Sequence, residues 1–128
     1  MRALLVLLFA LSVAGCGGVD VRQYAAEQPA LELSDYFNGE LEAWGMFQNR
    51  SGEVVKRFHV AMTGTWQGDV GTLDERFTYS DGSTERRVWT LRRQADGSWR
   101  GTAGDVVGEA IGEVSGNALH WRYQLLLK

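Results

Sequence analysis

The chain has 128 residues, a length typical of one domain. Its formal net charge is −3 and no block of like charge occurs, so nothing in the sequence favours a nucleic-acid partner. The single cysteine excludes an intramolecular disulfide, whereas five Trp, four Tyr and five Phe supply large apolar side chains for a core.

The chain begins MRALLVLLFALSVAGC, which is typical of a secretory signal peptide. Arg2 precedes an apolar run over residues 3–13 that is too short to span a bilayer. Residues 13–16 (VAGC) resemble the lipobox of bacterial lipoproteins. This resemblance implies that residues 1–15 are removed and that Cys16 is acylated, which would anchor the chain at about 0.8 kcal/mol per buried CH₂. The alternative is an ordinary signal peptide with an incidental cysteine.

Gly17 follows the predicted lipidation site. By analogy with Gram-negative lipoprotein sorting, the absence of Asp here favours the outer membrane, with the protein facing the periplasm. Residues 16–38 are expected to form the lipidated end and a tether or short helix, which Pro29 interrupts. The segment LSDYFNG at its end is typical of a turn that leads into a domain over residues 39–128.

From residue 39 onward, short runs alternate with period two, as in β-strands, and glycine-containing turns separate them. The predicted turns are NRSG, GDVG, SDGS, ADGS, AGDV and SGNA. They predict an all-β fold of about seven antiparallel strands in an up-and-down meander. Closed small barrels usually need about eight strands, so the sheet is expected to form a barrel or an open half-barrel.

A register that keeps large apolar side chains on one face places loops at residues 69–70 and 81–83. This register also avoids a cross-strand pair of Arg76 with Arg87, because two like charges opposite each other are unfavourable. The pairs predicted on the apolar face are Leu73 with Leu91, Glu75 with Trp89, Phe77 with Arg87, Trp66 with Leu73, Gly64 with Glu75 and Met62 with Phe77.

Glycine recurs at every fourth position of residues 104–116. Acidic residues interrupt the apolar run that a membrane helix would need, and the lysine of a phosphate-binding loop is missing. Residues four apart in a strand share one face, so strands are predicted here, with large neighbouring side chains over the glycines. The predicted pairs are Gly112 with Trp121, Ala110 with Tyr123, Gly108 with Leu125, Gly101 with Gly108 and Trp99 with Ala110.

Residues with catalytic or metal-binding chemistry are scattered. His59 and His120 are the only histidines, and neither has a second ligand at metal spacing, so no metal or cofactor is expected. No G-x-S-x-G motif occurs, and Cys16 would be blocked by acylation. Asp74 and Glu75 are adjacent in one strand and point to opposite faces. We therefore expect the protein not to be an enzyme.

Glu75 and Arg87 fall on the apolar face of the predicted register. Unpartnered charges are unfavourable there, so the two residues require an explanation. They form either a hydrogen-bonded structural pair or the polar anchor of a pocket, in which Arg87 clamps a carboxylate or phosphate head. Gly64, placed opposite Glu75, would leave space beside it.

Three stretches, YFNGELEAWGMFQNRSGEVVKRF, LDERFTYSDGSTERRVWTL and RGTAGDVVGEAIGEVSGNALHWRY, are similar to a family of Gram-negative lipoproteins, the domain of unknown function DUF3833. The similarity covers nearly the whole mature chain. It implies a cell-envelope lipoprotein with a lipocalin- or calycin-like β-barrel, and it carries no activity or catalytic residues to transfer. Members of that family continue beyond LHWRYQL with further β-segments, so the domain over residues 39–128 is expected to be C-terminally truncated.

The sequence therefore predicts an outer-membrane lipoprotein, bound to the membrane through Cys16, whose barrel holds a lipid or other amphipathic ligand. The alternative is a structural or interaction lipoprotein with a filled core and no ligand. The predicted ligand-binding residues are Met62, Trp66, Leu73, Glu75, Phe77, Arg87, Trp89, Leu91, Trp99, Tyr123 and Leu125.

Overall fold

The computed structural model describes residues 18–127. The predicted signal peptide over residues 1–15 and the lipidation site Cys16 lie outside the described residues. Two short helices precede the sheet. The elements in chain order are η1 (Val21–Tyr24), α1 (Leu33–Tyr36), β1 (Gly39–Gln48), β2 (Val54–Gln67), β3 (Val70–Tyr79), β4 (Thr84–Arg93), β5 (Trp99–Thr102), β6 (Ala110–Ser115) and β7 (Ala118–Arg122).

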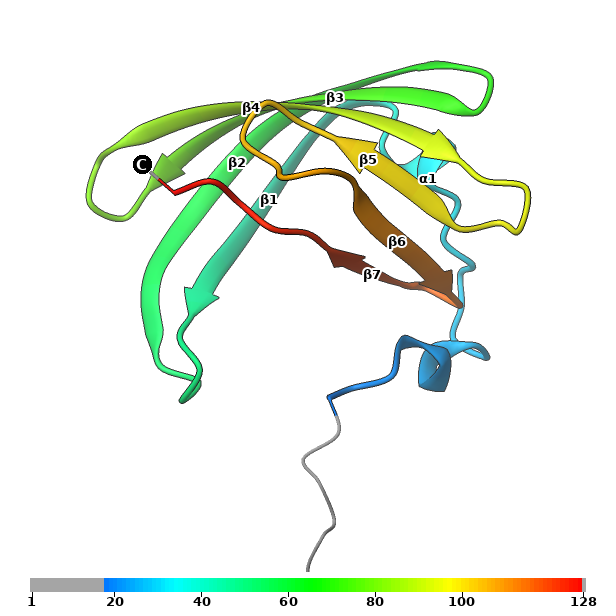
Figure 1. Ribbon diagram of the computed structural model, residues 1–128, viewed down its shortest axis with the longest axis horizontal. Helices are drawn as coiled ribbons and strands as arrows, with labels where there is room; N and C mark the ends of the chain where they lie inside the picture. Colours follow the sequence, from blue (N-terminus) through cyan, green and yellow to red (C-terminus); the bar gives the residue numbers. More distant parts are fainter. Residues whose placement is uncertain (1–17, 128) are drawn as a thin grey trace, which may run out of the picture.

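The seven strands form one antiparallel sheet in the order of the chain, from β1 to β7. The sheet curls into a half-barrel, and within the described residues no ladder joins β1 to β7 (Figure 1). The predicted fold, an all-β meander of about seven strands forming an open half-barrel, is therefore confirmed. No helix within residues 18–127 has the length and apolar character needed to cross a membrane.

The β3–β4 hairpin differs by two residues from the predicted register. Its loop is Ser80–Gly82, because the Tyr79 amide donates to the carbonyl of Ser83 at 2.9 Å, and Glu75 lies directly opposite Arg87. The last residue of this loop, Gly82, has a left-handed backbone conformation with φ of 84°. In the predicted loop, Ser83 would have been the last residue and would have had to adopt that conformation, which glycine adopts more readily. A shift of two residues keeps each side chain on its face, so the predicted apolar face is correct.

The expectation that two arginines would not lie opposite each other in this hairpin was wrong. Arg76 lies opposite Arg86. The Arg86 guanidinium binds both carboxylate oxygens of Asp74, at 2.9 and 2.7 Å, and this neighbouring negative charge offsets the repulsion.

The β2–β3 hairpin is shifted in the same way. Its loop is residues 68–69 rather than 69–70, and Gly68 takes the left-handed position with φ of 59°. Met62 rather than Gly64 therefore lies opposite Glu75, and Gly64 lies opposite Leu73.

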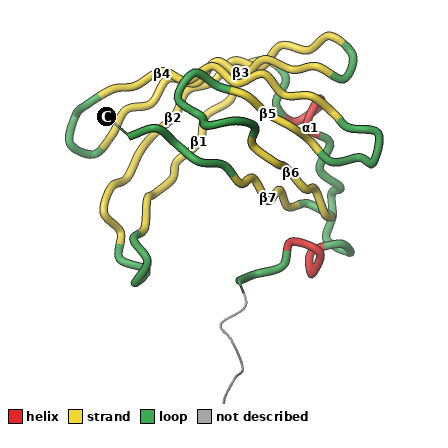
Figure 2. Tube along the Cα trace, viewed as in Figure 1, coloured by secondary structure: helices red, strands yellow, loops and turns green. Residues whose placement is uncertain are grey.

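The repeated glycines lie partly in a strand and partly in a loop. Gly112 pairs with Trp121 as predicted. Gly108 does not pair with Leu125, because residues 103–109 form a long loop in which Gly108 has φ of 64° (Figure 2). Leu125 instead bridges to Val106, and the longer loop moves the β5–β6 register by two residues, which places Trp99 opposite Gly112.

The concave face carries two apolar clusters. The larger cluster surrounds Trp89 and Trp99 and includes Leu33, which is 1% exposed. The smaller cluster consists of Val60, Met62, Phe77 and Tyr79 with their neighbours. Phe37, just after α1, packs against both. The segment before β1 thus covers one side of the concave face.

Glycines on the concave face lie beneath large aromatic rings. Gly45 lies under Phe58, Gly71 under Trp66, and Gly101 and Gly112 both under Trp121. At Gly64 the close neighbour is main chain, since a Cβ would overlap the carbonyl oxygen of Phe37. These positions let bulky side chains lie flat on the curved sheet.

Gly64 provides a direct test of this packing. We expect Gly64→Ala to lower the free energy of unfolding by about 1–3 kcal/mol, because the Phe37 carbonyl must move and its 3.0 Å hydrogen bond from Trp66 Nε1 is then strained. Urea denaturation monitored by tryptophan fluorescence measures the change. Gly104→Ala is the matched control: nothing lies within 4 Å of its Cβ, so stability should change by less than about 0.5 kcal/mol. Equal stability of the two variants would contradict the packing.

Candidate ligand-binding cavity

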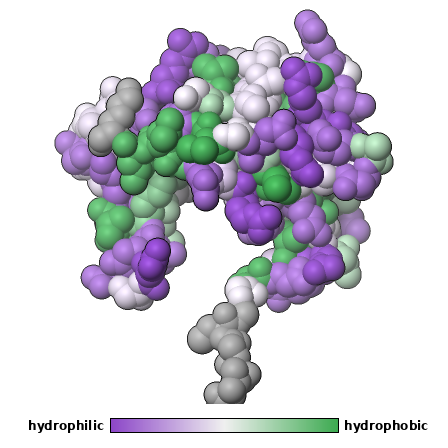
Figure 3. Space-filling view, viewed as in Figure 1, coloured by the Kyte–Doolittle hydropathy of each residue, from purple (hydrophilic) through white to green (hydrophobic). Residues whose placement is uncertain are grey.

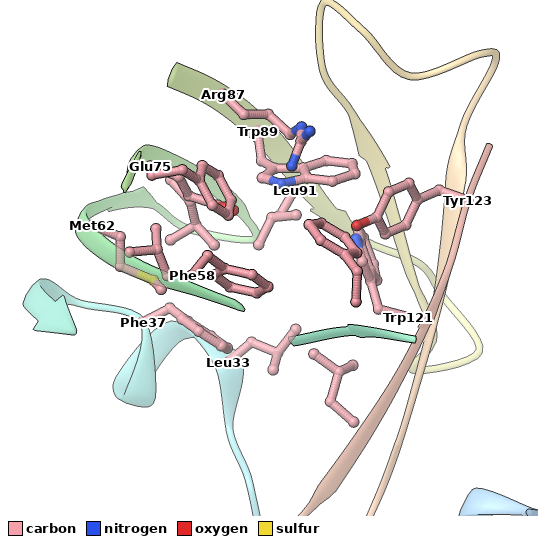
Figure 4. A pocket seen from close by; sticks show the side chains of 15 residues that line it. Leu33, Phe37, Phe58, Met62, Glu75, Arg87, Trp89, Leu91, Trp121 and Tyr123 are labelled. Carbon is pink, nitrogen blue, oxygen red and sulfur yellow. The ribbon is translucent and has the colours of Figure 1, made fainter. Parts of the chain in front are cut away.

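A cavity of about 220 Å³ lies between the two apolar clusters. For comparison, an engineered protein cavity of about 150 Å³ accepts benzene. Figure 3 shows the molecule hollowed between the β1–β2 side and the β6–β7 side. The lining residues are mostly aromatic and aliphatic: Leu33, Phe37, Phe47, Phe58, Val60, Met62, Leu73, Glu75, Phe77, Arg87, Trp89, Leu91, Leu119, Trp121 and Tyr123 (Figure 4).

Most of the predicted ligand-binding residues line this cavity. They are Met62, Leu73, Glu75, Phe77, Arg87, Trp89, Leu91 and Tyr123.

Three predicted ligand-binding residues, Trp66, Trp99 and Leu125, do not line the cavity. Trp66 and Trp99 share its face but stack edge to face, with centroids 5.6 Å apart, inside the larger cluster. Leu125 packs against the same cluster beside Val106. These three residues support the wall of the cavity.

The sequence analysis missed several lining residues. Phe58, Val60 and Trp121 share strand parity with the predicted residues Met62 and Tyr123, so extending the alternation would have found them. Leu33 and Phe37 had no comparable signal, because they belong to the segment expected to be a tether. Their place in the cavity wall depends on the path of the chain between η1 and β1.

Arg87 is held by Asp105, a residue that the sequence analysis assigned to a loop and to no site. The guanidinium is 6% exposed, and its Nε and Nη2 donate to the Asp105 carboxylate at 2.9 and 2.8 Å. These hydrogen bonds raise the pKa of Arg87. Glu75 and Arg87 lie opposite each other, but among the described residues no hydrogen bond or ion pair joins them, so the hydrogen-bonded pair expected from the sequence is not formed. Arg87 pairs with Asp105 instead, because the long β5–β6 loop brings Asp105 over β4.

Glu75 lines the cavity, half-buried and directly opposite Arg87. Burial raises the pKa of Glu75 from its ordinary value of 4.5 to about 7, although the charge of Arg87 and hydrogen bonding with Trp89 act against this rise. The negative charge of Asp105 raises it further. The carboxyl group therefore gains or loses its proton close to neutral pH.

Trp89, which hydrogen-bonds with Glu75, is part of an aromatic wall of the cavity. The Trp89 ring lies 5.3 Å from Trp121 and 5.1 Å from Tyr123, both edge to face. The Tyr123 hydroxyl points into the cavity (Figure 4), and burial raises its pKa. The polar groups that reach the interior thus lie at one end of a largely apolar space.

The two histidines lie apart from the cavity. His59 Nε2 is 2.8 Å from the Glu42 carboxylate, and His120 is exposed. Within residues 18–127, no three His, Cys, Asp or Glu side chains form a group that could hold a metal ion.

These features define an antiparallel β half-barrel with a largely apolar cavity and charged groups at one end of it. The chain belongs to the DUF3833 family of proteins of unknown function, whose family model matches residues 10–128. The resemblance inferred from the sequence is thus confirmed. No curated protein and no solved structure matches the chain.

The raised pKa of Glu75 predicts a pH-dependent stability. Between pH 4.5 and about 7 the folded protein holds a proton on Glu75 that the unfolded chain has lost. The contribution of this protonation to the free energy of unfolding is fully present below pH 4.5 and is lost as the pH rises to about 7. Glu75→Gln should therefore raise the free energy of unfolding by roughly 1–3 kcal/mol at about pH 8 and change it little at about pH 4.

Urea denaturation of both proteins across this pH range measures the effect. Glu113→Gln, on the exposed face of β6, is the control and should show no such difference. Equal effects of Glu75→Gln at both ends of the range would show that Glu75 is not desolvated in the folded protein.

Proposed function

We propose that this protein is a non-enzymatic lipoprotein of the cell envelope whose half-barrel binds a lipid or another amphipathic molecule. The observation that carries the proposal is the cavity of about 220 Å³ between the two apolar clusters. An apolar chain in this space would be removed from water at a gain of about 25 cal/mol per Å² of buried surface. The charged groups at one end give the ligand an orientation.

The anchor is the second part of the proposal. The lipobox-like sequence VAGC at residues 13–16 supports acylation of Cys16, and Gly17 supports sorting to the outer membrane. The protein would then face the periplasm on a tether. A membrane-bound carrier or sensor of amphipathic molecules would have its cavity close to the lipids that supply them.

Filling the cavity should abolish ligand binding. We expect Val60→Trp to lower binding of a fluorescent fatty-chain probe by about tenfold or more, because Val60 is buried and lines the cavity. Val88→Trp is the matched control, since Val88 lies on the exposed face of β4 and should not affect binding. Circular dichroism establishes that each variant is folded, and Leu119→Phe is a milder second filling variant. A wild-type protein that binds no chain probe would favour a structural lipoprotein without ligand.

Removing the predicted lipidation site should release the protein from the membrane. We expect Cys16→Ser to move the protein from the membrane pellet to the soluble periplasmic fraction, because the acyl chains are the proposed anchor. Fractionation with immunodetection measures the distribution, and mass spectrometry of the wild-type protein reports the added acyl groups. A variant that stays in the pellet would overturn the lipoprotein assignment.

A further inference from the structure

The charged groups near the cavity do not suit an anionic ligand. Arg87 is the cation among the lining residues, and its Nε and Nη2 are already bonded to Asp105. Glu75 adds a second carboxyl group beside this ion pair, and Glu85 lies 4.0 Å from Arg87 Nη2. A carboxylate or phosphate head would meet the negative charge of Glu75 while the guanidinium edge that could bind it is occupied.

The cavity also has features that suit a cation. The rings of Trp89, Trp121 and Tyr123 line it, and the faces of Trp and Tyr rings attract positive charge. The same kind of contact already occurs at the cavity, where the guanidinium of Arg87 lies 5.2 Å from the centre of the Phe77 ring. Lys56 Nζ likewise lies 4.6 Å from the centre of the Tyr79 ring. Glu75 would supply the counter-charge on the strand beside Arg87.

We propose that the cavity binds an amphiphile with a cationic head, a primary ammonium on an apolar chain, and that this head pairs with Glu75 between the rings of Trp89, Trp121 and Tyr123. This inference rests on the proposed function and specifies its ligand class. The ammonium group would complete a set of two ion pairs, with Arg87 bound to Asp105 and the ligand bound to Glu75. Each charge would then have a partner in a partly buried region.

Three probes of equal chain length test the charge of the head: dodecylammonium and dodecanoate, each below its micelle-forming concentration, and dodecanol, below its solubility limit. Binding to the full chain, freed of bound lipid, is followed by tryptophan fluorescence at about pH 8, where Glu75 is largely ionised. We expect dodecylammonium to bind about tenfold or more tightly than dodecanoate. Glu75→Gln should remove this preference, whereas the exposed control Glu113→Gln should keep it.

The outcomes separate the two proposals. If dodecanoate binds as tightly as dodecylammonium, or if Glu75→Gln keeps the preference for the ammonium probe, the cationic-head inference is overturned while ligand binding in the cavity stands. If none of the three probes binds the wild-type protein, the proposed function fails and the inference fails with it. Preferential binding of dodecylammonium that depends on Glu75 supports both.

Discussion

The inner surface of the half-barrel must be covered although the sheet does not close. Within residues 18–127 the strands run in order from β1 to β7 and no ladder joins the two ends, so these strands do not close over the concave face. Large side chains lying flat against the sheet take over that role. They can do so because the positions beneath them are glycines: Trp121 covers Gly101 and Gly112, and Phe58 covers Gly45. The cavity is the space that this covering leaves open.

The segment before β1 completes the covering and is held at several points. The amide of Leu31 donates to the carbonyl of Gly116 at 2.8 Å, in the turn between β6 and β7. At the other end, the Phe37 carbonyl lies against Gly64 and accepts the Trp66 hydrogen bond. Between these attachments, Leu33 is buried in the larger cluster. Residues 31–37 therefore act as part of the half-barrel wall, and they join the β7 side of the sheet to β2.

The sequence predicted the strands and their inner face because alternation with period two survives any register shift of two residues. The registers of the two hairpins around β3 depended on which loop residue adopts a left-handed conformation. Gly68 and Gly82 have this conformation, and assigning it to them from the sequence would have corrected both registers. The Arg87–Asp105 pair could not be predicted in this way. It joins residues 18 apart across a long loop, whose path depends on the bridge between Val106 and Leu125 rather than on any local pattern.

Glu75 is the residue that packing alone does not explain. A carboxyl group placed among Trp89, Phe77 and Met62 is partly desolvated, and its raised pKa shows that the folded state disfavours its charge. An apolar residue at this position would remove that penalty and add packing. Arg87 does not require Glu75 as its partner, because Asp105 already binds two of its nitrogens. Trp89 is the neighbour that hydrogen-bonds with Glu75. A partly desolvated carboxyl group that the Arg87–Asp105 pair does not need is compatible with a binding site, since such sites commonly lower stability in exchange for function. The proposed cation site would use Glu75 for recognition, whereas the Arg87–Asp105 pair holds the loop over residues 103–109 against β4.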